Sequence, residues 1–279
     1  MTKKRLIASL LVYNGNVVQT RHFKRTNMVG SAFTAVDFFN GWTVDEIVVL
    51  EISYSDAFLD RFVDIVGNLS RRCFVPLTVG GKIRDLDLVK RYTRAGADKV
   101  IVNTNAVRNP ELITAIAENY GSQCVVVSID GRENPSLTSG YEVVVDNGRE
   151  PSGRDVVFWG RECVKSGAGE IMINSLEHDG NKQGYNLDLT RLVADAVDVP
   201  VIAFGGAGKW QDFVAAINEG HADAAAAGNI FHYTEHSTKK AKEFMAQAGI
   251  PVRYSTFYRI NMPRFPAYEP YLHHQTRLK

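Results

Sequence analysis

The 279-residue sequence has few cysteines, no long apolar run and almost no net charge. The three cysteines, Cys73, Cys124 and Cys163, are far apart and odd in number, which argues against a disulfide framework or a metal-binding knuckle. No stretch approaches the roughly 18 apolar residues that a membrane helix needs. Lys and Arg number 32 against 31 Asp and Glu, a balance that argues against binding nucleic acid or a membrane surface. We therefore expect a soluble cytoplasmic protein with a small-molecule ligand.

Familiar catalytic signatures are missing as well. The sequence contains no GxSxG elbow, no HExxH and no Walker loop, and no cysteine lies in an evident nucleophile turn. His232 and His236 have one-turn spacing, but no further ligand is near them in the sequence, so no metal site is predicted. No cofactor is predicted either.

The hydrophobic residues, 45% of the chain, are arranged in strand-length runs that alternate with amphipathic, helix-length segments. This is the pattern of a parallel sheet with helical crossovers. The expected strands are residues 5–12, 46–52, 75–79, 99–103, 124–130, 170–175, 199–204 and 224–229. Helices that end in Gly are expected at 85–96, 110–121, 154–167 and 211–220. Eight βα units in about 250 residues predict an α/β fold, a (βα)8 TIM barrel over 1–253, with a separate arm at 254–279.

Two segments of the chain repeat one another in outline, one beginning PLTVGG at position 76 and the other beginning PVIAFGG at position 200. Asp98 follows Gly81 by 17 residues, and Asp223 follows Gly206 by the same 17. Two half-barrels of four βα units each would produce this spacing, although generic αβ units could also match by chance.

Each repeat places a Gly-Gly turn at the carboxyl end of a strand, where barrels commonly bind phosphate. The first site is expected to comprise Gly80, Gly81, Lys82, Asn103 and Thr104. The second is expected to comprise Gly205, Gly206, Gly228 and Asn229, aided by Asp179 and Gly180 of an HDG sequence. A single Gly-Gly turn usually has no binding role, but two at equivalent positions of the repeat predict a ligand with phosphates at opposite ends.

Charged residues mark both ends of the predicted strands. Asp130 ends the fifth strand, so its carboxylate is expected at the barrel mouth as a general acid or base, unless it only caps the next turn. Glu51 ends the second strand and is a weaker candidate. Four charges open strands 1, 2, 4 and 6: Arg5, Glu46, Lys99 and Glu170. They could form a ring of ion pairs at the bottom, or simply be ordinary charges that flank strands.

From residue 4 to about 253, the chain resembles the HisF family, the cyclase subunit of imidazole glycerol phosphate synthase. The motifs PLTVGG, AGADKV, NPELI, GSQCVVVSID, DGNKQGY, VPVIAFGGAG and GNIFH stand in the family's order. The resemblance implies a barrel with half-barrel symmetry that docks through its bottom on a HisH-like glutaminase and passes ammonia to the top. It also implies that the four bottom charges gate the ammonia entrance, with Gln123 beside them, and that the two turns hold a bisphosphate.

The mouth departs from the family pattern. HisF uses two aspartates for cyclisation; Asp130 matches the second, whereas Leu11 occupies the position of the first. Leucine cannot transfer a proton, so a step that needs both carboxylates would lose about 2 to 5 kcal/mol of transition-state stabilisation. Further replacements of family residues, which together point to a changed substrate, stand at Gln19, Lys82, Asn174 and Phe204.

The chain is similar to a HisF-like branch, the glycosyl amidation-associated proteins. In this branch the ammonia path through the barrel is kept, and the pair of aspartates used for cyclisation is lost. By that resemblance we expect ammonia delivery, with a HisH-like glutaminase and a separate N-acetyl sugar amidotransferase as partners in surface-polysaccharide synthesis. The expected ligand is a phosphorylated small molecule or a nucleotide sugar. Two alternatives stay open: a genuine cyclase subunit of histidine biosynthesis, and a non-catalytic scaffold of the glutaminase complex.

Overall fold

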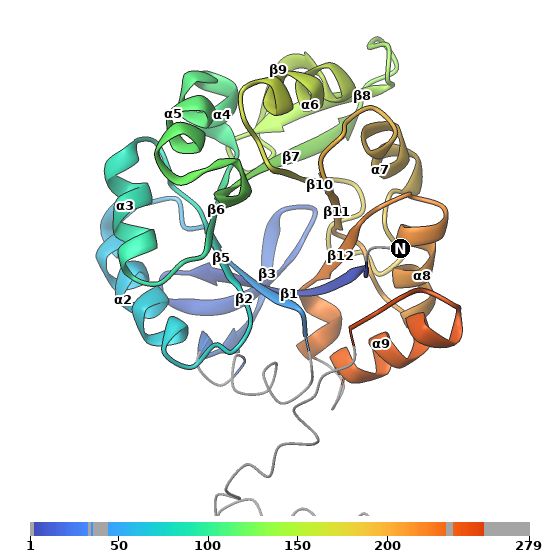
Figure 1. The fold of residues 1–279 in the computed structure, drawn as a ribbon, viewed down its shortest axis with the longest axis horizontal. Coiled ribbons are helices and arrows are strands. Elements are labelled where there is room, and N and C mark those ends of the chain that lie inside the picture. Colours follow the sequence, from blue (N-terminus) through green and yellow to red (C-terminus); the bar gives the residue numbers. More distant parts are fainter. Residues whose placement is uncertain (1–2, 33–34, 36–43, 233–236, 254–279) are drawn as a thin grey trace, which may run out of the picture.

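The computed structural model of the protein describes residues 3–32, 35, 44–232 and 237–253. In this part of the chain, eight parallel strands pair in sequence order and close into a barrel, because β1 pairs with β12 and β7 pairs with β10 (Figure 1). Their bounds are β1 (Arg5–Tyr13), β4 (Glu46–Glu51), β5 (Leu77–Gly80), β6 (Lys99–Val102), β7 (Val125–Glu133), β10 (Glu170–Ser175), β11 (Val201–Phe204) and β12 (Ala224–Ala227). The predicted (βα)8 barrel and all eight predicted strands are thus confirmed.

Helices surround the barrel, as Figure 1 shows. They are α2 (Leu59–Ser70), α3 (Leu86–Arg94), α4 (Thr104–Arg108), α5 (Glu111–Tyr120), α6 (Val156–Lys165), α7 (Leu187–Ala194), α8 (Trp210–Asn218) and α9 (Ser237–Gln247). Short 3-10 turns are η1 (Asp56–Phe58), η2 (Ser122–Cys124) and η3 (Asn229–His232). Side-chain caps fix some of the starts: the carboxylate of Asp85 accepts from Leu88 N at α3, and that of Asp155 accepts from Val157 N at α6. The four predicted helices are confirmed to within a few residues.

Two antiparallel hairpins extend the first and fifth barrel strands at the mouth, and neither was predicted. The first comprises β2 (Asn16–Arg21) and β3 (Lys24–Gly30), and the second comprises β8 (Tyr141–Val145) and β9 (Glu150–Asp155). Their outer strands, β3 and β9, are largely exposed and polar, so they lack the apolar alternation by which strands are recognised in a sequence.

Alternate residues of the barrel strands supply two apolar layers. On β1, Leu6, Leu10 and Val12 pack between the strands and the helices, whereas Ile7 points into the barrel with Val48 and Met172. The middle layer of the barrel interior is therefore apolar, with the buried hydroxyls of Ser9 and Ser128 above it.

A buried ion pair fastens α9 to the bottom of the barrel. The Lys242 ammonium lies 2.6 Å from the Asp45 carboxylate, which also accepts a hydrogen bond from Leu6 N. Burial lowers the pKa of Lys242, and the attraction of Asp45 opposes that shift. The predicted arm 254–279 lies outside the described residues. Among the described helices, none is long and apolar enough to cross a membrane.

Candidate functional site

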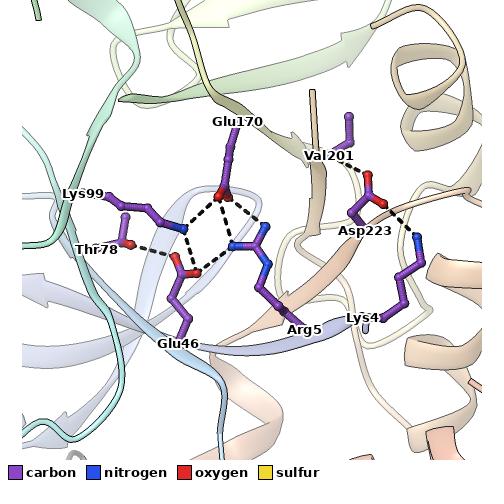
Figure 2. Close-up of polar contacts among 8 residues, drawn as sticks. All are labelled: Lys4, Arg5, Glu46, Thr78, Lys99, Glu170, Val201 and Asp223. Carbon is purple, nitrogen blue, oxygen red and sulfur yellow. Dashed lines mark hydrogen bonds and ion pairs between the residues drawn. The ribbon is translucent and has the colours of Figure 1, made fainter. Parts of the chain in front are cut away.

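Four charged side chains, each the first residue of a barrel strand, form a closed ion cluster that we call the floor ring (Figure 2). Arg5 donates to Glu46 at 2.8 Å and to Glu170 at 3.1 and 2.9 Å. Lys99 donates to the same two carboxylates at 3.0 and 2.8 Å. The Thr78 hydroxyl donates to the other oxygen of Glu46 at 2.7 Å. The carboxylates of Glu46 and Glu170 therefore each pair with both Arg5 and Lys99.

The floor ring is largely desolvated, which makes complete pairing necessary. The Glu46 side chain is 1% exposed and the other three are at most 16% exposed. Burial opposes the charge of Arg5, but the ion pairs with Glu170 and Glu46 outweigh it and raise the Arg5 pKa. Gln123 lies in the neighbouring turn η2 and does not join the ring. Its exposed amide donates to the carbonyl oxygen of Tyr120, the last residue of α5, at 3.2 Å.

At the opposite end of the strands, the mouth holds a cavity of about 630 Å³. Its lining includes apolar side chains of the barrel interior, among them Leu11, Leu50 and Met172. The lining also includes aromatic and basic side chains that were not predicted as site residues from the sequence: Tyr13, Phe23, Lys24, Arg25, Tyr54, Arg84 and Arg108. The only sequence signal for them was the basic turn HFKR at 22–25.

Asp130 lies at the mouth on β7, as predicted, and lines the cavity with 8% exposure. Asn103 Nδ2 donates to its carboxylate at 2.7 Å, and the side chain of Asn174, its neighbour on β10, also hydrogen-bonds to it. Burial raises the pKa of Asp130 from 3.8 to about 7, against the lowering effect of these two amides. A carboxyl that titrates near neutrality is suited to accept or donate a proton.

Replacing Asp130 with Asn tests this shift. Between pH values of about 4 and 7, the unfolded chain has lost the Asp130 proton while the folded chain keeps it, so the Asp130 contribution to stability falls as pH rises. An asparagine has no such proton. The free energy of unfolding of Asp130→Asn, relative to the unchanged chain, should therefore rise over this window by up to a few kcal/mol, measured by urea unfolding.

Asp155→Asn provides a matched control of opposite sign. Burial works against the charge of Asp155, but hydrogen bonds from Ser139, Phe158 and Val157 outweigh it and lower its pKa. Its contribution to stability is present above the ordinary aspartate pKa and is lost as pH falls through the lowered value. A pH-independent difference for Asp130→Asn, with the control behaving as stated, would contradict a raised Asp130 pKa.

The residues that depart from the HisF pattern gather at this cavity. Leu11, Lys82, Asn174 and Phe204 all line it. Gln19 is buried in the hairpin above, where its Oε1 accepts from Asn27 Nδ2 at 3.3 Å.

Glu51 also lines the cavity, but it pairs in register with Val12 of the outer apolar layer, and its Oε1 accepts from Ser53 N at 2.7 Å. Burial raises the pKa of Glu51. The register thus directs Glu51 away from the barrel axis, which makes it a poor substitute for an acid at position 11.

The first Gly-Gly turn opens into the cavity. Gly81, Lys82, Asn103 and Thr104 line it, and Gly80 is the last residue of β5. Asn103 is engaged with Asp130, and the Thr104 hydroxyl accepts from Asp146 N at 3.0 Å.

The second Gly-Gly turn is covered by the β2–β3 hairpin. The Asp179 carboxylate, predicted to aid phosphate binding, accepts from the Thr20 hydroxyl at 3.0 Å and from Phe23 N at 2.8 Å. The Asn229 amide donates to Thr20 O at 2.9 Å. Around these contacts, Gly180, Gly205, Gly206 and Gly228 line a pocket of only about 20 Å³.

Gly180→Ala should loosen this hairpin. A Cβ on Gly180, at φ +68°, would lie 2.0 Å from Thr20 O, whereas one on Gly153, at φ +71°, would meet nothing within 4 Å. Both alanines carry the backbone strain, but only the first displaces β2, so Gly180→Ala should cost about 1 to 3 kcal/mol more of unfolding free energy than Gly153→Ala. Hydrogen exchange should also increase in 16–30; equal costs and unchanged exchange would contradict the packing described.

Among the described residues, no group of three or more His, Cys, Asp or Glu side chains is placed to hold a metal ion. His232 is half-buried, and burial lowers its pKa, while His236 lies outside the described residues.

Comparison with known proteins places this geometry in context. Residues 5–237 match the sequence family described as "Histidine biosynthesis protein". The chain is also similar to imidazole glycerol phosphate synthase subunit HisF from Clostridium botulinum (strain Okra / Type B1). The two are 42% identical over 253 residues, which make up 91% of this chain and 100% of the relative.

Proposed function

The chain belongs to the histidine biosynthesis protein family, and from that premise we propose that it is a HisF-like synthase subunit that receives ammonia from a HisH-like glutaminase. The floor ring carries the proposal. It places four largely desolvated charges at one end of a barrel interior with an apolar middle layer, and the ligand cavity lies at the other end. Neutral ammonia can cross such an interior, whereas an ammonium ion would pay a large desolvation cost. We assign the ring residues as the ammonia entrance.

We place the acceptor outside the cyclisation chemistry of HisF. Asp130 is retained as a proton-transfer group, but Leu11 replaces the acid that should face it, and the other departures line the same cavity. The acceptor that fits the resemblance is an N-acetyl sugar that a separate amidotransferase converts in surface-polysaccharide synthesis. In this assignment the barrel supplies ammonia and the amidotransferase supplies activation of the sugar.

The test is to mix the purified chain with a HisH-like glutaminase and to measure co-elution and glutamine hydrolysis. A complex with stimulated hydrolysis supports the proposal. Absence of both a complex and stimulation, with each protein folded, would rule out ammonia delivery.

A second candidate is a genuine cyclase subunit of imidazole glycerol phosphate synthase. It is favoured by the 42% identity to a HisF over that protein's whole length. This function predicts growth without histidine when the chain replaces an authentic HisF; failure to grow, with good expression, would exclude it. A scaffold that only activates its partner is the remaining alternative, and it predicts no rise in melting temperature with any phosphorylated ligand.

A further inference from the structure

Two tyrosines lie at the carboxyl ends of neighbouring strands at the mouth. Tyr13 is the last residue of β1, and Tyr54 follows the end of β4, the strand beside it, by three residues. Their rings meet edge-to-face, with centroids 6.2 Å apart and an angle of 81° between the ring planes. Both residues line the cavity. Tyr13 and Tyr54 thus form an aromatic corner at the wall of the cavity.

Hydrogen bonds on both sides of Tyr13 hold the two strand ends together. Ile52 N donates to Val12 O at 2.9 Å, and Asn14 N donates to the Ser53 hydroxyl at 2.8 Å. The residues that flank one tyrosine are thereby tied to the two that precede the other. The aromatic corner is therefore preorganised, which reduces the entropy that a ligand must offset on binding.

The Tyr54 ring is held in place although the residue is 59% exposed. The guanidinium of Arg149 lies over this ring at 4.7 Å, and Arg149 is itself paired with Asp146 at 2.6 Å. The Tyr54 carbonyl oxygen accepts from Lys82 Nζ at 3.0 Å. An aromatic ring that is fixed but not buried offers a rigid apolar surface to a ligand.

The angle between the two rings indicates the shape of the group that fits them. A flat nucleobase gains most from parallel aromatic faces, which contact it on both sides, but the rings of the aromatic corner are nearly perpendicular. A pyranose is thicker than a base and carries C–H groups on its faces and edges, so it can contact both rings. Aromatic faces attract such C–H groups because the π electrons make the faces negative.

The rest of the cavity suits the hydroxyl groups of a sugar. Its volume, about 630 Å³, lies within the usual range of ligand sites, roughly 300 to 1,000 Å³. Its lining includes the amides of Asn105 and Asn147 and the carboxyls of Glu51 and Asp130, which can form hydrogen bonds with hydroxyl groups. A sugar needs both kinds of partner, because its C–H groups are apolar and its hydroxyls are polar.

From these observations we propose that the aromatic corner binds the pyranose ring of a sugar. The ring then lies in the same cavity as Asp130, at the end of the barrel opposite the floor ring. The inference rests on the proposed function only in identifying this sugar as the ammonia acceptor. It adds that the acceptor enters the barrel mouth, so that ammonia meets the sugar before it reaches the solvent.

Binding of N-acetylglucosamine to the full chain, compared with binding of uridine, tests the proposal. Saturation-transfer NMR should show transfer to the pyranose protons, and a titration should give a dissociation constant below about 50 mM, tighter than that of uridine. No binding of the sugar in this range, or binding of uridine that is equal or tighter, would overturn the proposal.

Three variants locate the bound sugar. Tyr54→Ala should weaken sugar binding at least about 5-fold because the aromatic surface is lost, whereas Tyr54→Phe keeps the ring and should bind within about 2-fold of the unchanged chain. Phe158→Ala is the matched control, since Phe158 is 58% exposed but lies on α6, away from the residues that line the cavity. Equal effects of Tyr54→Ala and Phe158→Ala would contradict a site at the aromatic corner.

These binding assays contain no glutaminase, so they separate the inference from the proposed function. Sugar binding by a chain that neither binds nor stimulates glutaminase would refute the proposed function and leave the inference standing. A stimulated glutaminase complex whose barrel binds no sugar would refute the inference and leave ammonia delivery standing.

Discussion

Glu46→Ala is expected to lower the free energy of unfolding by about 3 to 5 kcal/mol, the usual cost of breaking a buried ion pair from one side. Glu46 is the least exposed member of the floor ring and accepts from Arg5, Lys99 and Thr78. Its removal leaves two buried cations to share the single carboxylate of Glu170. Urea unfolding of the purified chain measures the loss.

The Lys4–Asp223 pair, which lies to one side of the floor ring in Figure 2, supplies the control. Its length, 2.8 Å, equals that of the Arg5–Glu46 contact, but its side chains are 25% and 44% exposed. Lys4→Ala should therefore cost about 1 kcal/mol or less. If Glu46→Ala cost no more than Lys4→Ala, the ring would not be the desolvated cluster described here.

Turnover of the HisF bisphosphate substrate by the purified chain, with ammonium salt at alkaline pH, should be at least about 100-fold slower than turnover by an authentic HisF. Leu11 offers no proton where the family places its first acid, and an acid–base group typically contributes about 100-fold to 10,000-fold. Substrate consumption followed by chromatography, in parallel assays of both proteins, gives the ratio. Equal rates would make this chain a working cyclase and overturn the ammonia-delivery proposal.

Leu11→Asp separates the missing acid from the other changes at the mouth. We expect this variant to remain slow, because Lys82, Asn174 and Phe204, which also depart from the HisF pattern, still line the cavity. Leu11→Asn, which is polar but cannot transfer a proton, controls for the change in the cavity wall. Recovery in Leu11→Asp alone would show that only the acid was missing, while the entry of ammonia through the floor would be unaffected.

Most of the barrel could be predicted because its strands are short apolar runs whose character does not depend on their neighbours. The hairpins could not, since β3 and β9 are paired through backbone hydrogen bonds and have mostly polar, exposed side chains. The floor ring was predictable for a related reason. A charge at the first position of a parallel barrel strand must lie at the bottom, whatever its partner is.

The mouth was less predictable because its chemistry depends on contacts between distant segments. Thr20 and Asp179 are separated by 159 residues, and Asn229 reaches Thr20 across 209. No local sequence pattern indicates such contacts, so the hydrogen bonds of the Asp179 carboxylate to the hairpin could not be predicted. Tyr13 and Tyr54 were overlooked because an aromatic residue near a strand end is usually part of the core.

The floor ring also has a consequence for the chain while it is being synthesised. Arg5 and Glu170 are 165 residues apart, so a nascent chain that ends after β7 carries Arg5, Glu46 and Lys99 but lacks the carboxylate that completes their pairing. In that unfinished sheet Arg5 and Lys99 have the single carboxylate of Glu46 to share, and the ring is complete only when β10 joins. The floor ring thus makes the pairing of the early strands depend on a strand that is synthesised much later.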